Sequence, residues 1–499
     1  MDDKKITEAR KYRIYPTEEQ KEQIIFNINA NREMWNHLLA YCYKPVMELD
    51  EIKNTPDKER TKKLYQYING YIEVVNDLTK KTQRVYSLKS LKSVIKKEKF
   101  EAINNFEEKS KFELDEFTVI KHGLIYDEQK ELFKRLSKIT VKEIYDEHTK
   151  LKHGDLNSYE KTRRNALKVA FQTHFNPAFK KADMPKFRSY RNTLYSGSYS
   201  TGAGSHSLIR DNGELKIYGF SKLKLGDIKM NNHYPIDGRL FKITITRTST
   251  DKYYASLFYY VPKHTRHYEK TNKNVGIDLN TTKHGFVKDD GNKFLPPNVD
   301  YLEQSLRREK AKLSKRLYNA NKVIAQRKHE QKIDPLVHVP SLLEFGRYQK
   351  QRKKVASIYE KITRRRNYWI KKTSSAIIRD HDFIAIEDLD VKGMLKVVHG
   401  EGAEKHHRLA KLIADSNFSK FRRELEYKAE WNDKKVIAIE RYFASSQTCY
   451  KCGHKNKDIG GEEGLSIREW ECPKCHEHHI RDVNAARNIL RRALEETIS

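Results

Sequence analysis

Three acidic residues, far apart in the chain, occupy positions where a carboxylate could bind a cation. Asp278 interrupts the apolar run 275–279, which is otherwise typical of a buried strand, and Glu387 ends the apolar strand predicted over 383–386. Asp482 lies near the start of a predicted C-terminal helix, where a short acid is also a natural N-cap. A carboxylate buried without a partner costs several kcal/mol, so an acid inside a strand needs a partner, commonly a cation. Taken singly, each acid also has an ordinary explanation as a strand end or a helix cap.

Four of the five cysteines form two pairs near the end of the chain. Cys449 and Cys452 form the first pair, and Cys472 and Cys475 follow about 20 residues later. This spacing is typical of a tetrahedral four-thiolate zinc site, in which the closed ligand shell makes the metal structural. Two disulfides are the alternative, and the cytosolic location that we expect disfavours them. Cys42 lies in an apolar helical pattern and is predicted to be an inert core thiol. Nearby histidines could replace a thiolate, but four cysteines are the preferred set; the histidines are His454, His476, His478 and His479.

The acid at Asp278 is predicted to lie on the first strand of an antiparallel meander. A second strand follows over 284–287, then a tight turn over 289–292 and a third strand over 293–295. Further upstream, hydrophobic periodicity predicts a strand over 11–15, and a capping box at Thr17 starts a helix that runs to about residue 41.

Two further regions are expected from their patterns. Residues 45–165 are rich in Lys and Glu and are predicted to form a helical bundle. Alternating strands over 241–246 and 253–261, joined by a turn, predict a hairpin within a small β-barrel. The apolar residues at helical spacing in the first region include Leu64, Ile68, Ile72 and Val75.

Positive charge is densest over residues 301–372, which carry 21 Lys/Arg and 6 Asp/Glu, a net +15. Two apolar stripes separated by Pro335 and Pro340 predict a helical hairpin with basic outer faces. Such faces are commonly just solvated, but the density of cations favours contact with phosphates. The residues singled out for this role are Arg352, Lys353, Lys354, Arg364, Arg365 and Arg366.

Composition supports a nucleic-acid partner. The 499 residues include 99 Lys/Arg and 68 Asp/Glu, a formal net charge of +31, which favours nucleic acid and, second, an acidic membrane surface. No apolar run approaches the ~20 residues that span a bilayer. We therefore expect a globular cytosolic protein of two to four domains rather than a membrane-spanning or secreted one.

The order of these motifs resembles that of the TnpB proteins of bacterial transposons and the miniature type V-F CRISPR effectors, which share a ribonuclease H-like, RuvC-type nuclease core. The length of the 45–165 region favours the type V-F effectors. The segments that carry the resemblance are the strand with Asp278, residues 384–389, 445–453, 472–475 and 481–486, and two N-terminal segments at 12–17 and 184–188.

The resemblance implies an α/β multidomain protein with an N-terminal wedge β-barrel, an inserted helical recognition domain, a RuvC-like nuclease core with a basic helical hairpin, and an inserted zinc ribbon. The implied boundaries are 1–17 and 175–270 for the wedge, 18–174 for recognition, 271–444 and 479–499 for the nuclease, 301–378 for its hairpin and 445–478 for the ribbon.

The function that the resemblance implies is RNA-guided DNA cleavage in the cytoplasm of a prokaryote, in antiviral defence. A guide RNA pairs with one target strand beside a short flanking motif. Asp278, Glu387 and Asp482 would hold two Mg²⁺ ions, or Mn²⁺, because hard cations prefer carboxylate oxygens, and Arg468 would lie near the cleaved phosphate. One structural Zn²⁺, double-stranded and single-stranded DNA as substrates, and a homodimer on one guide RNA are also implied.

Three alternatives stay open at this point. The chain could be a TnpB nuclease guided by transposon-end RNA, an RNA-guided DNA-binding protein that does not cut, or a DNA transposase that joins strands with similar acids. The presence of all three acids disfavours a protein that only binds.

Overall fold

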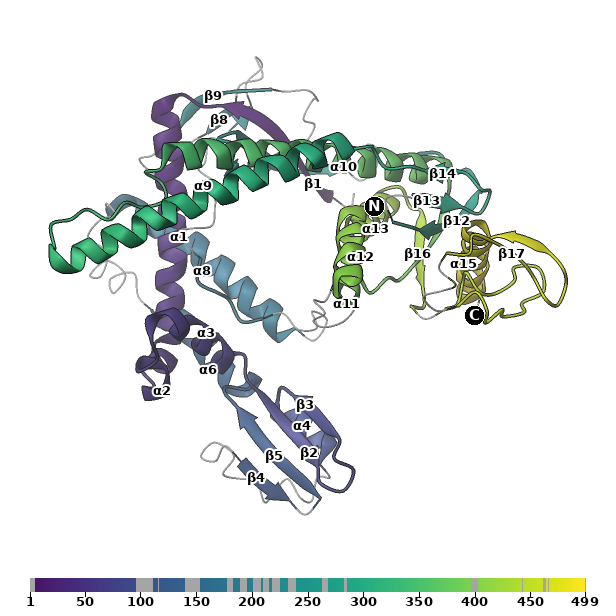
Figure 1. Cartoon of the computed structure of the whole chain (residues 1–499), viewed down its shortest axis with the longest axis horizontal. Helices are drawn as coiled ribbons and strands as arrows, with labels where there is room; N and C mark the ends of the chain where they lie inside the picture. Colours follow the sequence, from purple (N-terminus) through teal and green to yellow (C-terminus); the bar gives the residue numbers. More distant parts are fainter. Residues whose placement is uncertain are drawn as a thin grey trace. The chain divides into compact units, whose positions relative to one another are not determined.

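The structure is a computed structural model of the chain (Figure 1). The described chain forms two compact units, one from residues 7–260 and the other from residues 1–6 with 261–499. The residues described are 5–95, 111–114, 116–139, 153–176, 183–188, 195–200, 208–209, 215–217, 225–231, 239–262, 268–281, 285–395, 403–441, 443–460, 464 and 466–498.

The unit that carries the three acids is built on a five-stranded sheet in the order β14-β13-β12-β15-β16. β12, β13 and β14 pair antiparallel, so the predicted meander is confirmed, although residues 282–284 lie outside the described part of the chain. β15 and β16 extend the sheet with parallel pairing. The strands are β12 (Asn274–Leu279), β13 (Phe286–Lys288), β14 (Lys293–Phe294), β15 (Phe383–Glu387) and β16 (Lys435–Ile439).

Helices cover both faces of this sheet. Ile277, Ile384 and Ile386 belong to one core cluster with residues of α10 and α13. Phe383 and Ala385, which alternate with them on β15, pack with α15 on the other face. The three helices are α10 (Gly346–Asp380), α13 (Phe418–Trp431) and α15 (Arg481–Ile498).

Gly276 allows α15 to lie directly on the backbone of β12. A Cβ atom added at Gly276 would lie 2.0 Å from the carbonyl oxygen of Ala486 and 2.8 Å from Cβ of Leu490. Contacts this short are impossible for a real side chain, so only glycine permits this helix-to-strand distance.

The predicted basic helical hairpin is confirmed as α9 (Asp300–Ile333) and α10. Its apolar seam contains Leu302, Leu306, Val355, Ile358 and Ile362. These helices are long but highly charged, and no helix in the described part of the chain is long and apolar enough to cross a membrane. Two shorter helices follow β15, namely α11 (Val391–Met394) and α12 (Ala403–Ser416).

The cysteine-rich segment between β16 and α15 contains one small antiparallel sheet. Its strands are β17 (Glu469–Glu471) and β18 (His478–Ile480), and α15 starts directly after β18. Its buried centre is formed by Cys449, Cys472, Trp470 and Ile459, and the partly buried Cys452 and Cys475 pack against it.

The other unit contains a seven-stranded sheet, in which the strand predicted over 11–15 pairs with β9 and the predicted hairpin is formed by β10 and β11. In the described part of the chain the outer strands of this sheet are β6 and β7, and the closed barrel expected for this region stays a prediction. In order, the strands are β6 (Tyr195–Ser200), β10 (Arg239–Arg247), β11 (Tyr253–Pro262), β1 (Lys5–Tyr15), β9 (Gly226–Met230), β8 (Leu215–Ile217) and β7 (Leu208–Ile209).

The long helix after β1 starts as predicted and runs further than predicted. α1 (Glu18–Met47) begins with a capping box, in which Gln20 N–H donates to Thr17 Oγ1 and Thr17 N–H donates to the Gln20 side chain. Cys42 on this helix is fully buried, and burial raises the pKa of Cys42 to about 12, as expected for an inert core thiol.

The prediction of an all-helical bundle over 45–165 is wrong in part. Ile72 and Val75 lie on a strand of a four-stranded sheet in the order β3-β2-β5-β4. The preceding helix ends at Ile68, Gly70 lies close to the backbone of His122, and the β-branched residues that follow pair with β5. The elements here are α2 (Asp50–Lys53), α3 (Asp57–Ile68), β2 (Tyr71–Asn76), β3 (Thr82–Val85), α4 (Leu88–Val94), β4 (Lys111–Leu114), β5 (Phe117–His122), α6 (Tyr126–Lys138) and α8 (His153–Phe175).

We expect Gly276→Ala to destabilise the unit that contains the five-stranded sheet by about 1–3 kcal/mol, because α15 must move away from β12 to admit the methyl group. Thermal unfolding followed by circular dichroism measures this loss. Gly346→Ala is the matched control, since a Cβ added at Gly346 meets no atom within 4 Å. Equal stability of the two variants would show that the close approach at Gly276 does not limit the packing of α15.

Candidate active site and zinc site

Strand alternation places Asp278 and Glu387 on the sheet face that α15 covers. Side chains two residues apart on a strand point to the same face of the sheet. Asp278 therefore shares a face with Gly276, which lies against α15, and Glu387 shares a face with Ala385, which packs with residues of α15. Ile277 and Ile386 are partners in the parallel pairing of β12 with β15. Asp278 and Glu387 each directly follow one of these paired residues, so they lie on neighbouring strands at the carboxyl edge of the sheet.

The position of α15 on the sheet brings Asp482 to the same edge. Asp482 precedes Ala486, which lies over Gly276, by about one helical turn and so projects from the same side of the helix. The helix begins at Arg481, which places Asp482 in its first turn rather than at the N-cap, and the side chain is buried. The structure thus brings the three predicted acids together, while their catalytic role stays a prediction.

The electrostatics of Asp278 show how closely the acids lie. Desolvation, followed by repulsion from Glu387 and Asp482, raises the pKa of Asp278 well above its ordinary value, against the opposing effects of Asn280 and Arg481. Burial also raises the pKa of Glu387. A site in which neighbouring carboxylates raise the pKa of one of their number carries more negative charge than its surroundings neutralise.

Each acid has a polar neighbour that orients it. Asn280 Nδ2 donates to Asp278 Oδ2 at 2.8 Å, and the Ser445 hydroxyl donates to Glu387 Oε1. Arg468 Nη1 lies 3.3 Å from Asp482 Oδ1, so the arginine singled out by resemblance does contact one of the predicted acids. Ser445 precedes the first cysteine pair, and Arg468 precedes the second. The cysteine-rich segment therefore supplies two of the groups that contact the three acids.

Two asparagines on α15 fix the segment that contains Ser445, and the sequence analysis missed them. Asn488 Nδ2 donates to the carbonyl oxygens of Ser445 and Thr448, at 2.9 and 2.6 Å, and Asn484 Nδ2 donates to the same Thr448 oxygen at 2.8 Å. Both asparagines are almost fully buried, with 2% and 0% of their surfaces exposed. The available signal was their spacing of four residues inside a helix, where asparagine is a poor helix former.

Arg481 was also missed, and it positions Arg468. Its backbone N–H donates to the Arg468 carbonyl oxygen at 2.8 Å, and its guanidinium donates to the carbonyl oxygens of Gly464 and Ile467. Burial lowers the pKa of Arg481, and the charges of Asp482 and Asp278 partly oppose that shift.

The donor chemistry of this edge fits a hard divalent cation. The three side chains offer only carboxylate oxygens, and their mutual repulsion is what a bound cation would relieve. Among the described residues, the group whose donor atoms all lie within 4.8 Å of one another is formed by the four cysteines.

The four cysteines fit a zinc ion closely. Cys449 and Cys475 have their sulfurs 3.6 Å apart, as do Cys452 and Cys472. Zinc–sulfur bonds of ~2.3 Å in a tetrahedron give sulfur–sulfur distances of about 3.8 Å, whereas a disulfide would require about 2.05 Å. A hydrogen bond from the backbone of His454 lowers the pKa of Cys452 to about 7.

Of the four nearby histidines, His479 comes into contact with this cluster. Its Nε2 lies 3.0 Å from Cys449 Sγ, and its ring lies 4.7 Å from that of Trp470. The group of residues that could hold a metal consists of the four cysteines. His479 is not part of this group, and its side chain contacts one of the four ligands, Cys449.

The basic residues of the hairpin are placed differently from one another. Arg364 and Lys353 are exposed, and Arg365 lies over the ring of Tyr301 with 5.1 Å between Cζ and the centroid. Lys354 pairs with Glu309 at 3.3 Å, and Arg352 donates weakly to Gln349 at 3.5 Å.

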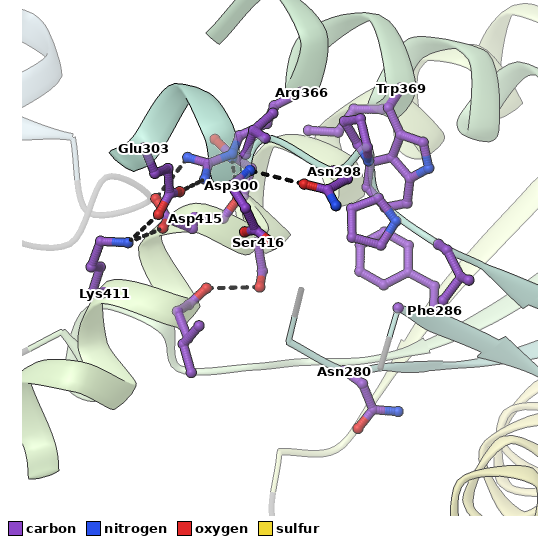
Figure 2. Close-up of a pocket in the computed structure, with 18 residues that line it drawn as sticks. Asn280, Phe286, Asn298, Asp300, Glu303, Arg366, Trp369, Lys411, Asp415 and Ser416 are labelled. Carbon is purple, nitrogen blue, oxygen red and sulfur yellow. Dashed lines mark hydrogen bonds and ion pairs between the residues drawn. The ribbon is translucent and has the colours of Figure 1, made fainter. Parts of the chain in front are cut away.

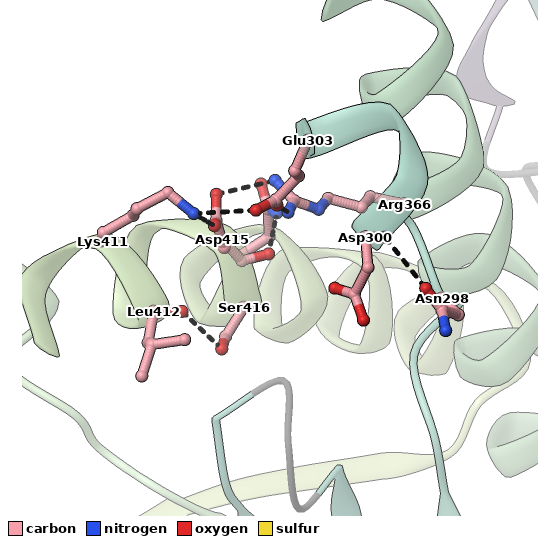
Figure 3. Close-up of polar contacts among 9 residues, drawn as sticks. Asn298, Asp300, Glu303, Arg366, Lys411, Leu412, Asp415 and Ser416 are labelled. Atoms are coloured by element: carbon pink, nitrogen blue, oxygen red, sulfur yellow. Dashed lines mark hydrogen bonds and ion pairs between the residues drawn. The ribbon is translucent and has the colours of Figure 1, made fainter. Parts of the chain in front are cut away.

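Arg366 has a structural task within the protein. Its guanidinium contacts Asp415 at 2.7 Å and Glu303 at 2.8 Å, and Lys411 contacts the same two carboxylates at 3.0 and 3.1 Å (Figure 3). These pairs join α9, α10 and α12. The guanidinium of Arg366 is therefore already engaged, and this geometry does not favour the phosphate contact predicted for it.

We expect the purified protein to contain about one zinc atom per chain, because four thiolates complete one tetrahedral shell. Cys475→Ser should lower the zinc content well below one and lower the unfolding temperature, since structural zinc contributes to folding. Elemental analysis and thermal unfolding measure both effects. Cys42→Ala is the control and should keep the zinc. Folded wild-type protein without zinc would refute the assignment.

Three family models match parts of the chain. Residues 418–489 match the "Cas12f1-like, TNB domain", residues 256–398 match "Probable transposase", and residues 1–45 match a "Helix-turn-helix domain". In the last segment, the residues described here form strand β1 followed by helix α1.

Two curated relatives carry the description "Putative RNA-guided DNA endonuclease". One, from Streptomyces pristinaespiralis, is 29% identical over 324 residues, which cover 65% of this chain and 68% of that protein. The other, InsQ from Escherichia coli, is 28% identical over 274 residues, which cover 54% and 60%. Other relatives, from a mimivirus, are named TnpB-like proteins.

A search of solved structures finds Cas12f1 in a complex with guide RNA and target DNA, at 14% identity and a TM-score of 0.37, covering 97% of this chain and 98% of that one. The matched domains and the named relatives bear out the resemblance on which the sequence analysis rested. The chain is thus similar to proteins described as RNA-guided DNA endonucleases and TnpB-like proteins, and its residues 418–489 are similar to the Cas12f1-like TNB domain.

Proposed function

We propose that this protein is an RNA-guided DNA endonuclease that hydrolyses DNA phosphodiesters at the edge formed by Asp278, Glu387 and Asp482. The single observation that carries the proposal is the gathering of these three acids at one edge of the sheet, two on its strands and one on α15, where Glu387 and Asp482 raise the pKa of Asp278. The names of the relatives support the same activity.

The proposed site would hold divalent cations, Mg²⁺ or Mn²⁺, through the three carboxylates. Bound there, such cations would neutralise charge on the phosphate and activate water. The chain's own residues orient these ligands: Asn280 holds Asp278, and Ser445 holds Glu387. Arg468 places a positive charge beside Asp482, where a phosphate of the cut strand would need one.

The formal charge of +31 supports a guide RNA and target DNA as partners. We assign phosphate contact to the exposed cations of the hairpin, Arg364 and Lys353, and recognition of the guide and the flanking motif to residues 1–270. The wedge, recognition, nuclease and ribbon boundaries given by resemblance, and the homodimer on one guide RNA, stay predictions.

We expect Asp278→Ala to abolish DNA cleavage and to leave RNA-dependent DNA binding nearly intact, because the carboxylate serves the reaction rather than recognition. Plasmid cleavage with Mg²⁺ and the copurified RNA, together with a filter-binding assay, measures the two properties separately. Asp290→Ala is the matched control: this acid lies in the β13–β14 turn and pairs with Lys288, at 2.7 Å. Undiminished cutting by the Asp278 variant would remove this acid from the mechanism, and a wild-type protein that binds without cutting would favour a DNA-binding role.

The guide RNA distinguishes a CRISPR effector from a transposon-associated nuclease. We expect RNA that copurifies with the protein to derive from CRISPR repeats, and sequencing of that RNA tests this. Transcripts that map to a transposon end would instead identify a TnpB nuclease, in agreement with the names of several relatives.

A further inference from the structure

A pocket of about 370 Å³ lies beside the proposed active site, which is within the range of small-molecule sites. Asn280, whose amide group holds Asp278, lines this pocket as well (Figure 2). Any group bound in the pocket would therefore lie next to the strand being cut. The start of α9, the middle of α10 and the end of α12 also line the pocket.

The charges that line the pocket leave one carboxylate unpaired. Glu303 and Asp415 are neutralised by Arg366 and Lys411 in the network described above. Asp300 has no ion pair and accepts no side-chain hydrogen bond from any described residue, and its carboxylate points away from that network (Figure 3). With three acids and two cations, the pocket carries one excess negative charge and disfavours a phosphate group.

The amides of the pocket present acceptors. Asn280 uses its NH₂ group on Asp278, and Asn417 uses its NH₂ group on the carbonyl oxygen of Asp415 at 2.8 Å. Asn417 stands at the start of α13 and makes no side-chain cap. The side-chain carbonyl oxygens of both residues therefore remain available, so a ligand of this pocket should donate hydrogen bonds.

One wall of the pocket is apolar and aromatic. Trp369 and Phe286 have their ring centroids 5.0 Å apart, and Leu295 beside them is largely exposed. Two consecutive prolines, Pro296 and Pro297, complete this wall. A flat aromatic group that donates hydrogen bonds from its edge fits such a lining better than a metal ion does.

We propose that this pocket binds a guanine base of the strand that is cut. Guanine presents two adjacent donors, N1–H and the N2 amine, and the free carboxylate of Asp300 can accept both. The other bases do not offer this pair, so the pocket would prefer guanine near the cleaved phosphodiester. The assignment of the bound strand rests on the proposed function.

The test measures binding, so that it does not depend on cleavage. Fluorescence anisotropy of the wild-type protein with its copurified RNA and without added Mg²⁺ compares thymine oligonucleotides that carry one central guanine, inosine or thymine. Inosine lacks only the N2 amine of guanine. We expect the guanine strand to bind about tenfold more tightly than the inosine strand, which is the size expected for one hydrogen bond to a charged group, and the thymine strand to bind no better than the inosine strand.

The variant Asp300→Leu should remove this preference, and exchanging guanine for inosine should weaken its binding no further, because the variant has no acceptor left for the N2 amine. Asp334→Leu, at the other end of α9, is the matched control and should retain the preference. Equal binding of the three strands by the wild-type protein, a preference that persists in Asp300→Leu, or its loss in Asp334→Leu would each overturn the proposal. A guanine preference in a protein that never cuts would leave this pocket in place and refute the proposed nuclease function alone.

Discussion

The contact on which the candidate site depends is the close seating of α15 on β12 at Gly276. Strand alternation alone would place Asp278 and Glu387 on one face of the sheet, but it says nothing about a residue two hundred positions later in the chain. The absence of a side chain at Gly276 fixes the helix against the strand backbone. The spacing of four residues within α15 then carries Asp482 to the edge where the two strands end.

Hydrogen bonds join the cysteine-rich segment to the sheet edge at which the three acids lie. Asn484 and Asn488 hold the backbone before the first cysteine pair, Ser445 in that backbone holds Glu387, and Arg468 before the second pair contacts Asp482. Buried amides with satisfied hydrogen bonds specify one geometry, whereas apolar packing tolerates shifts. A metal that orders the cysteines would therefore also order two groups that contact the acids.

The sequence predicted those features that depend on local pattern. Each of these features depends on residues that are close together in the sequence: they are the meander around Asp278, the capping box of α1, the basic hairpin and the cysteine spacing. The strand at Ile72 was missed because short apolar runs fit both the helical and the strand period, and pairing with Lys121 on β5, far along the chain, decided the outcome. Ser445 and Arg481 were missed for the same reason, since their partners lie far along the chain.

Considered by itself, the close arrangement of Asp278, Glu387 and Asp482 is unfavourable for folding. Like charges in a partly desolvated edge raise the free energy of the folded state, and Asn280 and Arg481 offset this only in part. Structural acids usually avoid such costs by pairing fully, as Glu303 and Asp415 do with Arg366 and Lys411. The same unit thus contains one acid cluster that is neutralised from within and one that is not. The cluster that is not neutralised is the one expected to meet a cation from outside the chain.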